Sequence, residues 1–120
     1  MRSAHGFTLI ELILVVAIMG ILAAILIPNL MSARTSAVNN GANAYARNVY
    51  AASSAYIAED SAHTTADFET TDCTTGYTGV TGYALSDPGN AVMACSVTAL
   101  SSTEFTVSVT SSAGVTFSMP

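Results

Sequence analysis

The chain has 120 residues, which is enough for one small domain once a long apolar segment near the N-terminus is set apart. Its formal net charge is −5, it contains no lysine, and no arginine follows Arg47. The distal part therefore lacks the cations that phosphate binding needs, so we expect no direct nucleic-acid binding, and fibre cross-linking through lysine amines is excluded.

The first element is an apolar run from Phe7 to Ile27, which follows the polar residues 1–6. As a helix the run would measure about 31 Å at 1.5 Å per residue, enough to cross a bilayer core. In an ordinary secretory signal a small residue follows the apolar core, and the core is removed. Here the small residue, Gly6, comes before the run. A cut after Gly6 would remove residues 1–6 as a leader and keep the helix.

Glu11 interrupts this run with a carboxylate, which costs roughly 1–3 kcal/mol in hydrocarbon even on lenient insertion scales. Two plain interpretations exist. In one, the protein is a membrane-anchored surface binding module whose Glu11 extends to the lipid headgroups. In the other, a conventional signal peptide is cleaved after Ala33 and leaves a secreted domain.

Beyond the run, a helix with an apolar stripe is predicted. Pro28 removes one backbone hydrogen bond and should kink the helix without ending it. The stripe has steps of three and four residues and consists of Val38, Ala42, Tyr45, Val49, Ala52 and Tyr56. We therefore expect one kinked helix, with an apolar, transmembrane half at 7–28 and an amphipathic half at 29–58.

The rest of the chain reads as an acidic loop at 59–79 and an antiparallel sheet at 80–120. Apolar residues alternate with Ser and Thr in two runs, one with Phe105, Val107 and Val109, the other with Val115, Phe117 and Met119. The sequence "SSAG" joins these runs as a hairpin, and "DPGN" separates two further strands near 81–86 and 91–98. The expected fold class is α+β, a long helix packed on about four strands.

Cys73 and Cys95 are expected to form a disulfide if the distal half is exported, closing a loop of about 22 residues. Free thiols or an incomplete metal pair are the alternatives. The acids Asp67, Glu69 and Asp72 do not have EF-hand spacing and read as a solvated loop. No catalytic, phosphate-binding or metal signature is present, so we expect no enzyme activity, cofactor or metal site.

The sequence "GFTLIEL" with the apolar run behind it resembles the N-terminus of the type IV pilin family, part of the pilin and pseudopilin superfamily whose prepilins carry a class III signal peptide. The resemblance covers residues 1 to about 34. It implies that a prepilin peptidase and methyltransferase cuts between Gly6 and Phe7 and N-methylates Phe7. It also implies that Glu11 is the assembly carboxylate, and that Gly20 and Pro28 are the two positions that weaken the helix.

The same resemblance implies a single-pass inner-membrane precursor that assembly machinery polymerises into an extracellular helical homopolymer. Such a filament serves motility, adhesion or DNA uptake. The alternatives within the superfamily are a type II secretion pseudopilin and a minor pilin. In a polymer, the new amine of Phe7 would pair with Glu11 of the same or a neighbouring subunit. This pairing would stabilise subunits packed in the correct axial register over subunits packed in a wrong one.

Overall fold

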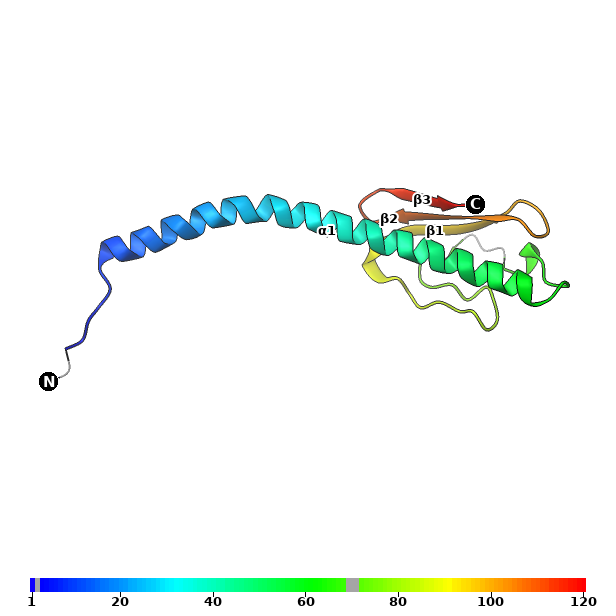
Figure 1. Cartoon of the computed structure of the whole chain (residues 1–120), viewed down its shortest axis with the longest axis horizontal. Helices are drawn as coiled ribbons and strands as arrows, with labels where there is room; N and C mark the ends of the chain where they lie inside the picture. The colour runs from blue at the N-terminus through cyan, green and yellow to red at the C-terminus, as the bar shows by residue number, and fades with distance from the viewer. Residues whose placement is uncertain (2, 69–71) are drawn as a thin grey trace. The chain divides into compact units, whose positions relative to one another are not determined.

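The computed structural model describes residues 1, 3–68 and 72–120, and one helix, α1, runs from Leu9 to Glu59. The chain forms two compact units, Met1–Arg34 and Thr35–Pro120, whose helix and strands are labelled in Figure 1. Unit 1 holds the polar N-terminal residues and the first half of α1. Glu69, one of the acids considered above for calcium, lies outside the described residues.

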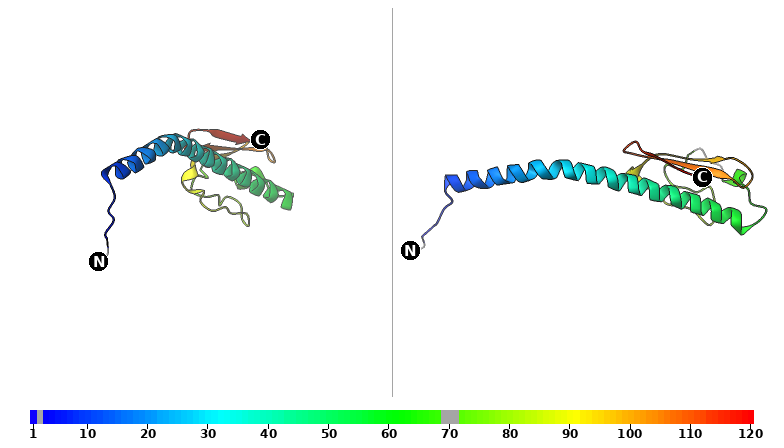
Figure 2. Two further views of the ribbon diagram at one scale, coloured as in Figure 1. Left: turned by 60° about the vertical axis from the view of Figure 1, so that its left-hand side comes forward. Right: turned by 45° about the horizontal axis from the view of Figure 1, so that its top comes forward.

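Unit 2 is a small α+β domain, in which the second half of α1 packs on a three-stranded antiparallel sheet (Figure 2). The strands are β1 (Val92–Ala99), β2 (Phe105–Ser111) and β3 (Thr116–Met119), in the order β1-β2-β3. Two short 3₁₀ helices, η1 (Thr65–Asp67) and η2 (Gly89–Ala91), lie in the connection between α1 and β1. The expected fold class is confirmed.

The two-residue periodicity predicted β2 and β3 because one face of each strand is apolar. Val107 and Val109 of β2 are fully buried, and they pair with Met119 and Phe117 of β3. The hairpin turn lies at the predicted "SSAG" sequence, where the N–H of Gly114 donates to the carbonyl of Ser111 at 2.9 Å. Gly114 has a φ of +88°, a left-handed conformation that favours glycine.

The core of unit 2 joins the predicted helix stripe to the inner face of the sheet. Aromatic and aliphatic side chains from the loop between them complete it. The buried apolar residues are Ala42, Tyr45, Ala46, Val49, Ala52, Phe68, Cys73, Tyr77, Val80, Val92, Cys95, Val97, Phe105, Val107 and Val109.

The predicted strand near 81–86 is replaced by irregular chain within the described residues. It contributes one isolated bridge, between Leu85 and Tyr77, to the antiparallel pairing. Gly82, with a φ of +90°, turns the chain there, and this conformation is incompatible with a continuous strand. The sheet therefore has three strands where about four were expected.

A second local feature concerns β1, where strict alternation along the strand would place Met93 on the same face as Cys95 and Val97. The pairing with β2 shifts between Val92 and Ala94, as in a β-bulge. The shift turns Met93 outward, where it is 61% exposed, and Val92 takes the buried position.

Candidate functional site

The residues with a predicted role in processing lie at the start of α1, in unit 1. Gly6 and Phe7 precede the helix and are exposed, and a Cβ added at Gly6 would meet nothing within 4 Å. Glu11 lies in the first turn of the helix. The Gly6–Phe7 peptide bond is therefore outside the helix, and the carboxylate belongs to its first turn.

A reciprocal hydrogen-bonded pair, Thr8 and Glu11, closes the first turn of α1. The backbone N–H and the hydroxyl of Thr8 both donate to Oε2 of Glu11 at 2.8 Å. In return, the backbone N–H of Glu11 donates to the Thr8 hydroxyl oxygen at 3.3 Å. This is a capping box, in which N-cap and N3 residues satisfy each other's free N–H groups. Sequence reasoning missed the role of Thr8, although the spacing T-x-x-E before an apolar run is its known signal.

The capping box gives Glu11 a local structural role. Its carboxylate accepts two hydrogen bonds from uncharged groups of one residue, and it lies at the positive end of the helix dipole. These contacts stabilise the carboxylate at this position. Both donors are uncharged, so neither of them neutralises the negative charge of Glu11. A cation that approached Oε1 or Oε2 would find the carboxylate already oriented.

Gly20 and Pro28 both lie inside α1, which continues through Pro28. Pro28 has no N–H to donate to the preceding turn. Next to it, the side-chain amide of Asn29 donates to the carbonyl of Ile25 at 3.2 Å, an additional hydrogen bond in this turn. A Cβ added at Gly20 would meet nothing within 4 Å, so unit 1 itself does not require a glycine there.

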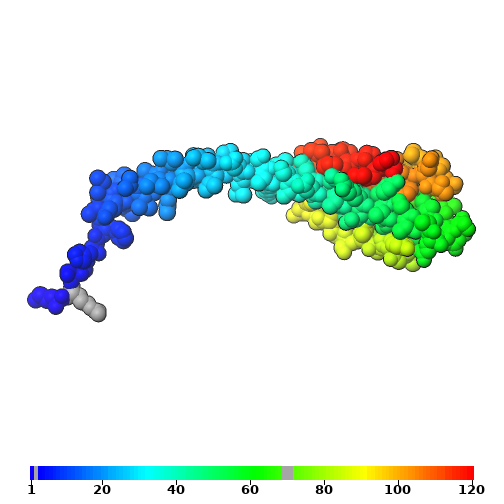
Figure 3. All heavy atoms as spheres, viewed as in Figure 1, coloured from blue at the N-terminus to red at the C-terminus, as the bar shows by residue number. Residues whose placement is uncertain are grey.

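The large apolar side chains of unit 1 are exposed, and in the space-filling view the helical part of this segment is a rod one helix thick (Figure 3). An 18-residue window of α1 has a mean hydropathy of 3.0 and is 0% buried, and by length and composition the helix is able to cross a membrane. Fully burying one Leu or Ile side chain is worth about 1.5–3 kcal/mol. This surface therefore favours transfer into lipid or packing against other apolar helices.

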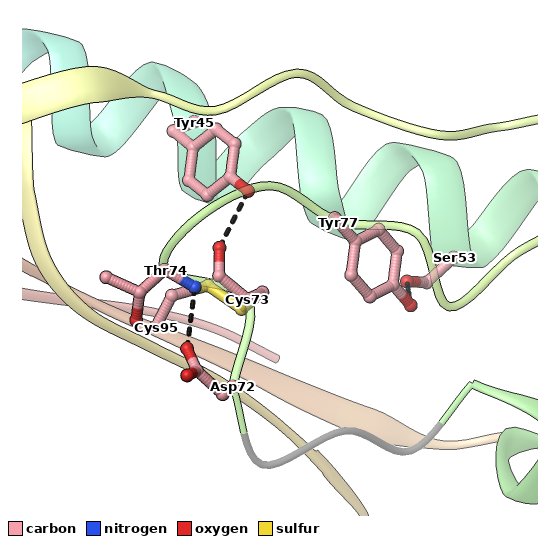
Figure 4. Close-up of a disulfide and its surroundings, with 7 residues drawn as sticks. All are labelled: Tyr45, Ser53, Asp72, Cys73, Thr74, Tyr77 and Cys95. Carbon is pink, nitrogen blue, oxygen red and sulfur yellow. Dashed lines mark hydrogen bonds between the residues drawn. A yellow bond between two sulfur atoms is a disulfide. The ribbon is translucent and has the colours of Figure 1, made fainter.

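The predicted disulfide between Cys73 and Cys95 is confirmed, and it lies in unit 2 with a Cα–Cα distance of 4.9 Å (Figure 4). The hydroxyl of Tyr45 on α1 donates to the carbonyl of Cys73 at 2.8 Å. Further along α1, the hydroxyls of Ser53 and Tyr77 lie 2.8 Å apart. The bridge and these two contacts attach the 73–77 segment to both β1 and α1.

The contact at Tyr45 leads to a prediction about alkaline stability. Burial raises the pKa of Tyr45 to about 12, and Asp87 and Tyr77 add to the shift. An unfolded tyrosine ionises near its ordinary value of about 10. The contribution of protonated Tyr45 to the free energy of unfolding is therefore complete below about pH 10, and it is lost as the pH rises toward about 12.

We expect Tyr45→Phe to lower the free energy of unfolding by about 1 kcal/mol at pH 7, because the hydrogen bond to Cys73 is lost. Above pH 10 the variant should lose less further stability than the wild type, although Tyr77, whose pKa is also raised by burial, still titrates. Urea unfolding in detergent from pH 7 to 12 measures both effects. Tyr83→Phe, at a half-buried tyrosine, is the matched control. An unchanged pH slope in Tyr45→Phe would contradict this prediction.

Metal ligands do not gather in the described part of the chain, where no group of three or more His, Cys, Asp and Glu side chains is placed to hold an ion. Asp67 and Asp72 each bond to nearby backbone instead. Asp67 accepts from the N–H of Thr64 at 2.8 Å, and Asp72 accepts from the N–H of Thr74 at 2.9 Å. The hydrogen bonds from Thr74 hold the pKa of Asp72 below its usual value.

Comparison with known proteins gives one match to a family model and one to a curated relative. Residues 1–27 match the pattern described as the prokaryotic N-terminal methylation motif. Over 45 residues the chain is 60% identical to the type IV wide pilus major component PilA4 of Thermus thermophilus. The matched segment covers 38% of this chain and 34% of that relative. No solved structure matches the chain.

Proposed function

We propose that the chain is a structural subunit of a type IV pilus-like filament, because residues 1–27 match the N-terminal methylation motif and a type IV pilus component is 60% identical over 45 residues. In this proposal the prepilin peptidase cuts between Gly6 and Phe7 and N-methylates Phe7. The precursor is held in the inner membrane by α1. Inner-membrane assembly machinery then extracts the mature chain into an extracellular homopolymer that serves motility, adhesion or DNA uptake.

One observation carries the proposal: the methylation motif ends in a helix whose apolar side chains are uncovered throughout unit 1. A monomer in water would not keep so much apolar surface exposed, because its burial is strongly favourable. Lipid covers this surface in the precursor, and neighbouring helices would cover it in a filament. The same surface thus serves the two successive states of a pilin.

We further propose that Glu11 sets the register of the polymer. In the precursor, the nitrogen of Phe7 is an uncharged amide, and the carboxylate is held by Thr8. Cleavage turns that nitrogen into an ammonium group four residues before Glu11. In an apolar filament core, the ammonium of one subunit and the carboxylate of another, or of its own, attract strongly, while an unpaired charge is costly. Subunits that pack in the wrong register are therefore disfavoured.

Gly20 and Pro28 are proposed to let α1 adapt when subunits pack. Glycine lowers helix stability by about 1 kcal/mol relative to alanine, and proline removes one backbone hydrogen bond. The nine-residue segment from Gly20 to Pro28 is therefore the weakest part of the apolar half of α1. A filament with a tight helical core gains from a local change of conformation there.

The relative supports a pilus subunit over the alternatives within the superfamily, a type II secretion pseudopilin or a minor pilin. That protein is a major component of a pilus. A structural role also leaves no reaction to catalyse, so we propose that the chain is not an enzyme. A membrane-anchored binding module would use α1 as an anchor only, and its helix would tolerate loss of the Glu11 charge.

The cut after Gly6 is tested by Gly6→Val. We expect processing to fall by about hundredfold, since even a small misplacement at a scissile bond has this effect, and filaments to disappear. A Cβ at Gly6 meets nothing within 4 Å, so the change acts on the peptidase and not on the fold. Immunoblots separate precursor from mature chain, and Ala4→Val, inside the leader but away from the bond, is the matched control. Normal processing of Gly6→Val would place the cut elsewhere.

A further inference from the structure

Helix α1 starts directly after Thr8, and the Gly6–Phe7 bond lies just outside the helix. In a helix, the N–H of Glu11 would donate to the carbonyl of Phe7, four residues earlier. Here it donates to the hydroxyl of Thr8 at 3.3 Å. Likewise, the N–H of Thr8 donates to Glu11 Oε2 at 2.8 Å and is withdrawn from any helical bond to Ala4.

The first regular helical bond follows directly after this pair. The N–H of Leu12 donates to the carbonyl of Thr8 at 3.3 Å. Residues 3–8 are outside regular secondary structure, and Phe7 is 93% exposed. The capping box thus separates a helix that begins at Leu9 from an open chain that contains the bond between Gly6 and Phe7.

Without the box, the apolar environment favours a longer helix. In a bilayer little water is available to accept a hydrogen bond from a backbone N–H group, and an unsatisfied group there costs several kcal/mol. A hydrogen bond to a backbone carbonyl removes this cost. In such a longer helix, the N–H groups of Leu9, Ile10 and Glu11 would donate to the carbonyls four residues earlier, those of His5, Gly6 and Phe7. Helix extension would therefore place the carbonyl of the scissile bond inside an intrahelical hydrogen bond. A protease needs that carbonyl free, in a chain that it can bind in extended form.

We propose that Thr8 is a positioning residue for processing, which stops the helix at Leu9 through its capping box with Glu11 and keeps the Gly6–Phe7 bond open to the peptidase. This proposal rests on the proposed function, because it requires the cut after Gly6. Thr8 acts through the helix start and not through the reacting atoms. The rate of cleavage should therefore depend on whether the side chain at position 8 can cap a helix, and not on whether it has the shape of threonine.

Four variants of the full chain in detergent micelles, cleaved by a purified prepilin peptidase, test this proposal. Thr8→Val keeps the shape and removes the hydroxyl, and we expect its kcat/KM for cleavage to fall about fivefold, the equivalent of one lost cap. Thr8→Ser and Thr8→Asn restore capping with different shapes. The kcat/KM for cleavage of these two variants should stay within about twofold of the wild-type value. Glu11→Gln keeps an N3 partner that completes a capping box, and it should also be cleaved normally.

Carbon chemical shifts of Phe7 supply a structural readout in the same micelles. We expect Phe7 to be non-helical in the wild type, Thr8→Ser and Thr8→Asn, and helical in Thr8→Val. Cleavage of Thr8→Val at the wild-type rate, or Thr8→Asn as slow as Thr8→Val, would overturn the capping role. Wild-type chain that the peptidase leaves uncut after Gly6 would instead overturn the proposed function, so the two failures are distinguishable.

Discussion

We expect Glu11→Ala to abolish surface filaments, whereas the precursor should still enter the membrane. Without the carboxylate, the ammonium group created on Phe7 has no partner in the apolar filament core, where an unpaired charge costs several kcal/mol. Every subunit interface repeats this cost, so assembly fails as a whole. Electron microscopy of sheared material and immunoblots of membranes measure the two outcomes.

Glu11→Gln separates the charge of Glu11 from its capping role. Glutamine completes the capping box with Thr8, so the helix start is preserved. We therefore expect this variant to be processed normally and to form no filaments. Glu59→Gln makes the same chemical change at the exposed C-terminal end of α1 and should leave filaments unchanged. Normal filaments from Glu11→Gln would contradict the charge pairing and would favour a helix that serves only as an anchor.

Loss of the disulfide is expected to have the largest effect on the stability of unit 2. The bridge closes a loop with a sequence separation of 22 residues. In the loop-entropy relation a cross-link of this size is worth about 3 kcal/mol. The double variant Cys73→Ala, Cys95→Ala should lower the free energy of unfolding by about that amount. It should also loosen the 73–77 segment, which Tyr45 and Tyr77 attach to α1.

Urea unfolding in detergent, followed by circular dichroism, measures this loss. Reduced wild type is the matched control, because it lacks the cross-link but keeps both sulfur atoms. Reductant should destabilise the wild type by nearly the same amount as the double substitution and should not affect the double variant. A double variant within about 0.5 kcal/mol of the oxidised wild type, the range of an ordinary surface substitution, would show that the loop does not depend on the bridge.

The regular elements of the fold were predictable from the sequence because periodicity reports burial. Val107 and Val109 alternate with hydroxyl side chains on β2, and Tyr45 and Val49 recur at helical spacing on α1; all four are buried. The segment near 81–86 has no such constraint. Gly82 takes a positive φ there, and Leu85 makes a single bridge. The path of this segment depends on packing against distant residues, which the local sequence does not encode.

The candidate site was partly predictable for a different reason. Gly6, Phe7 and Glu11 stand out because a small residue and a carboxylate at the start of an apolar run need an explanation. Thr8 does not stand out, since a single hydroxyl at the edge of such a run is common. Its T-x-x-E spacing with Glu11 signals a capping box only where a helix starts directly after the threonine, and helix ends are poorly determined by periodicity.

The most direct test is the mass of the N-terminal peptide of material sheared from the cell surface. A peptide that begins at an N-methylated Phe7 is the predicted result. It would establish that the cut follows Gly6, and that Glu11 and the uncovered helix are present in the extracellular polymer. A peptide that begins after Ala33 would remove α1 up to that point, with Glu11, from the mature protein. It would contradict both the proposed processing and assembly through the helix.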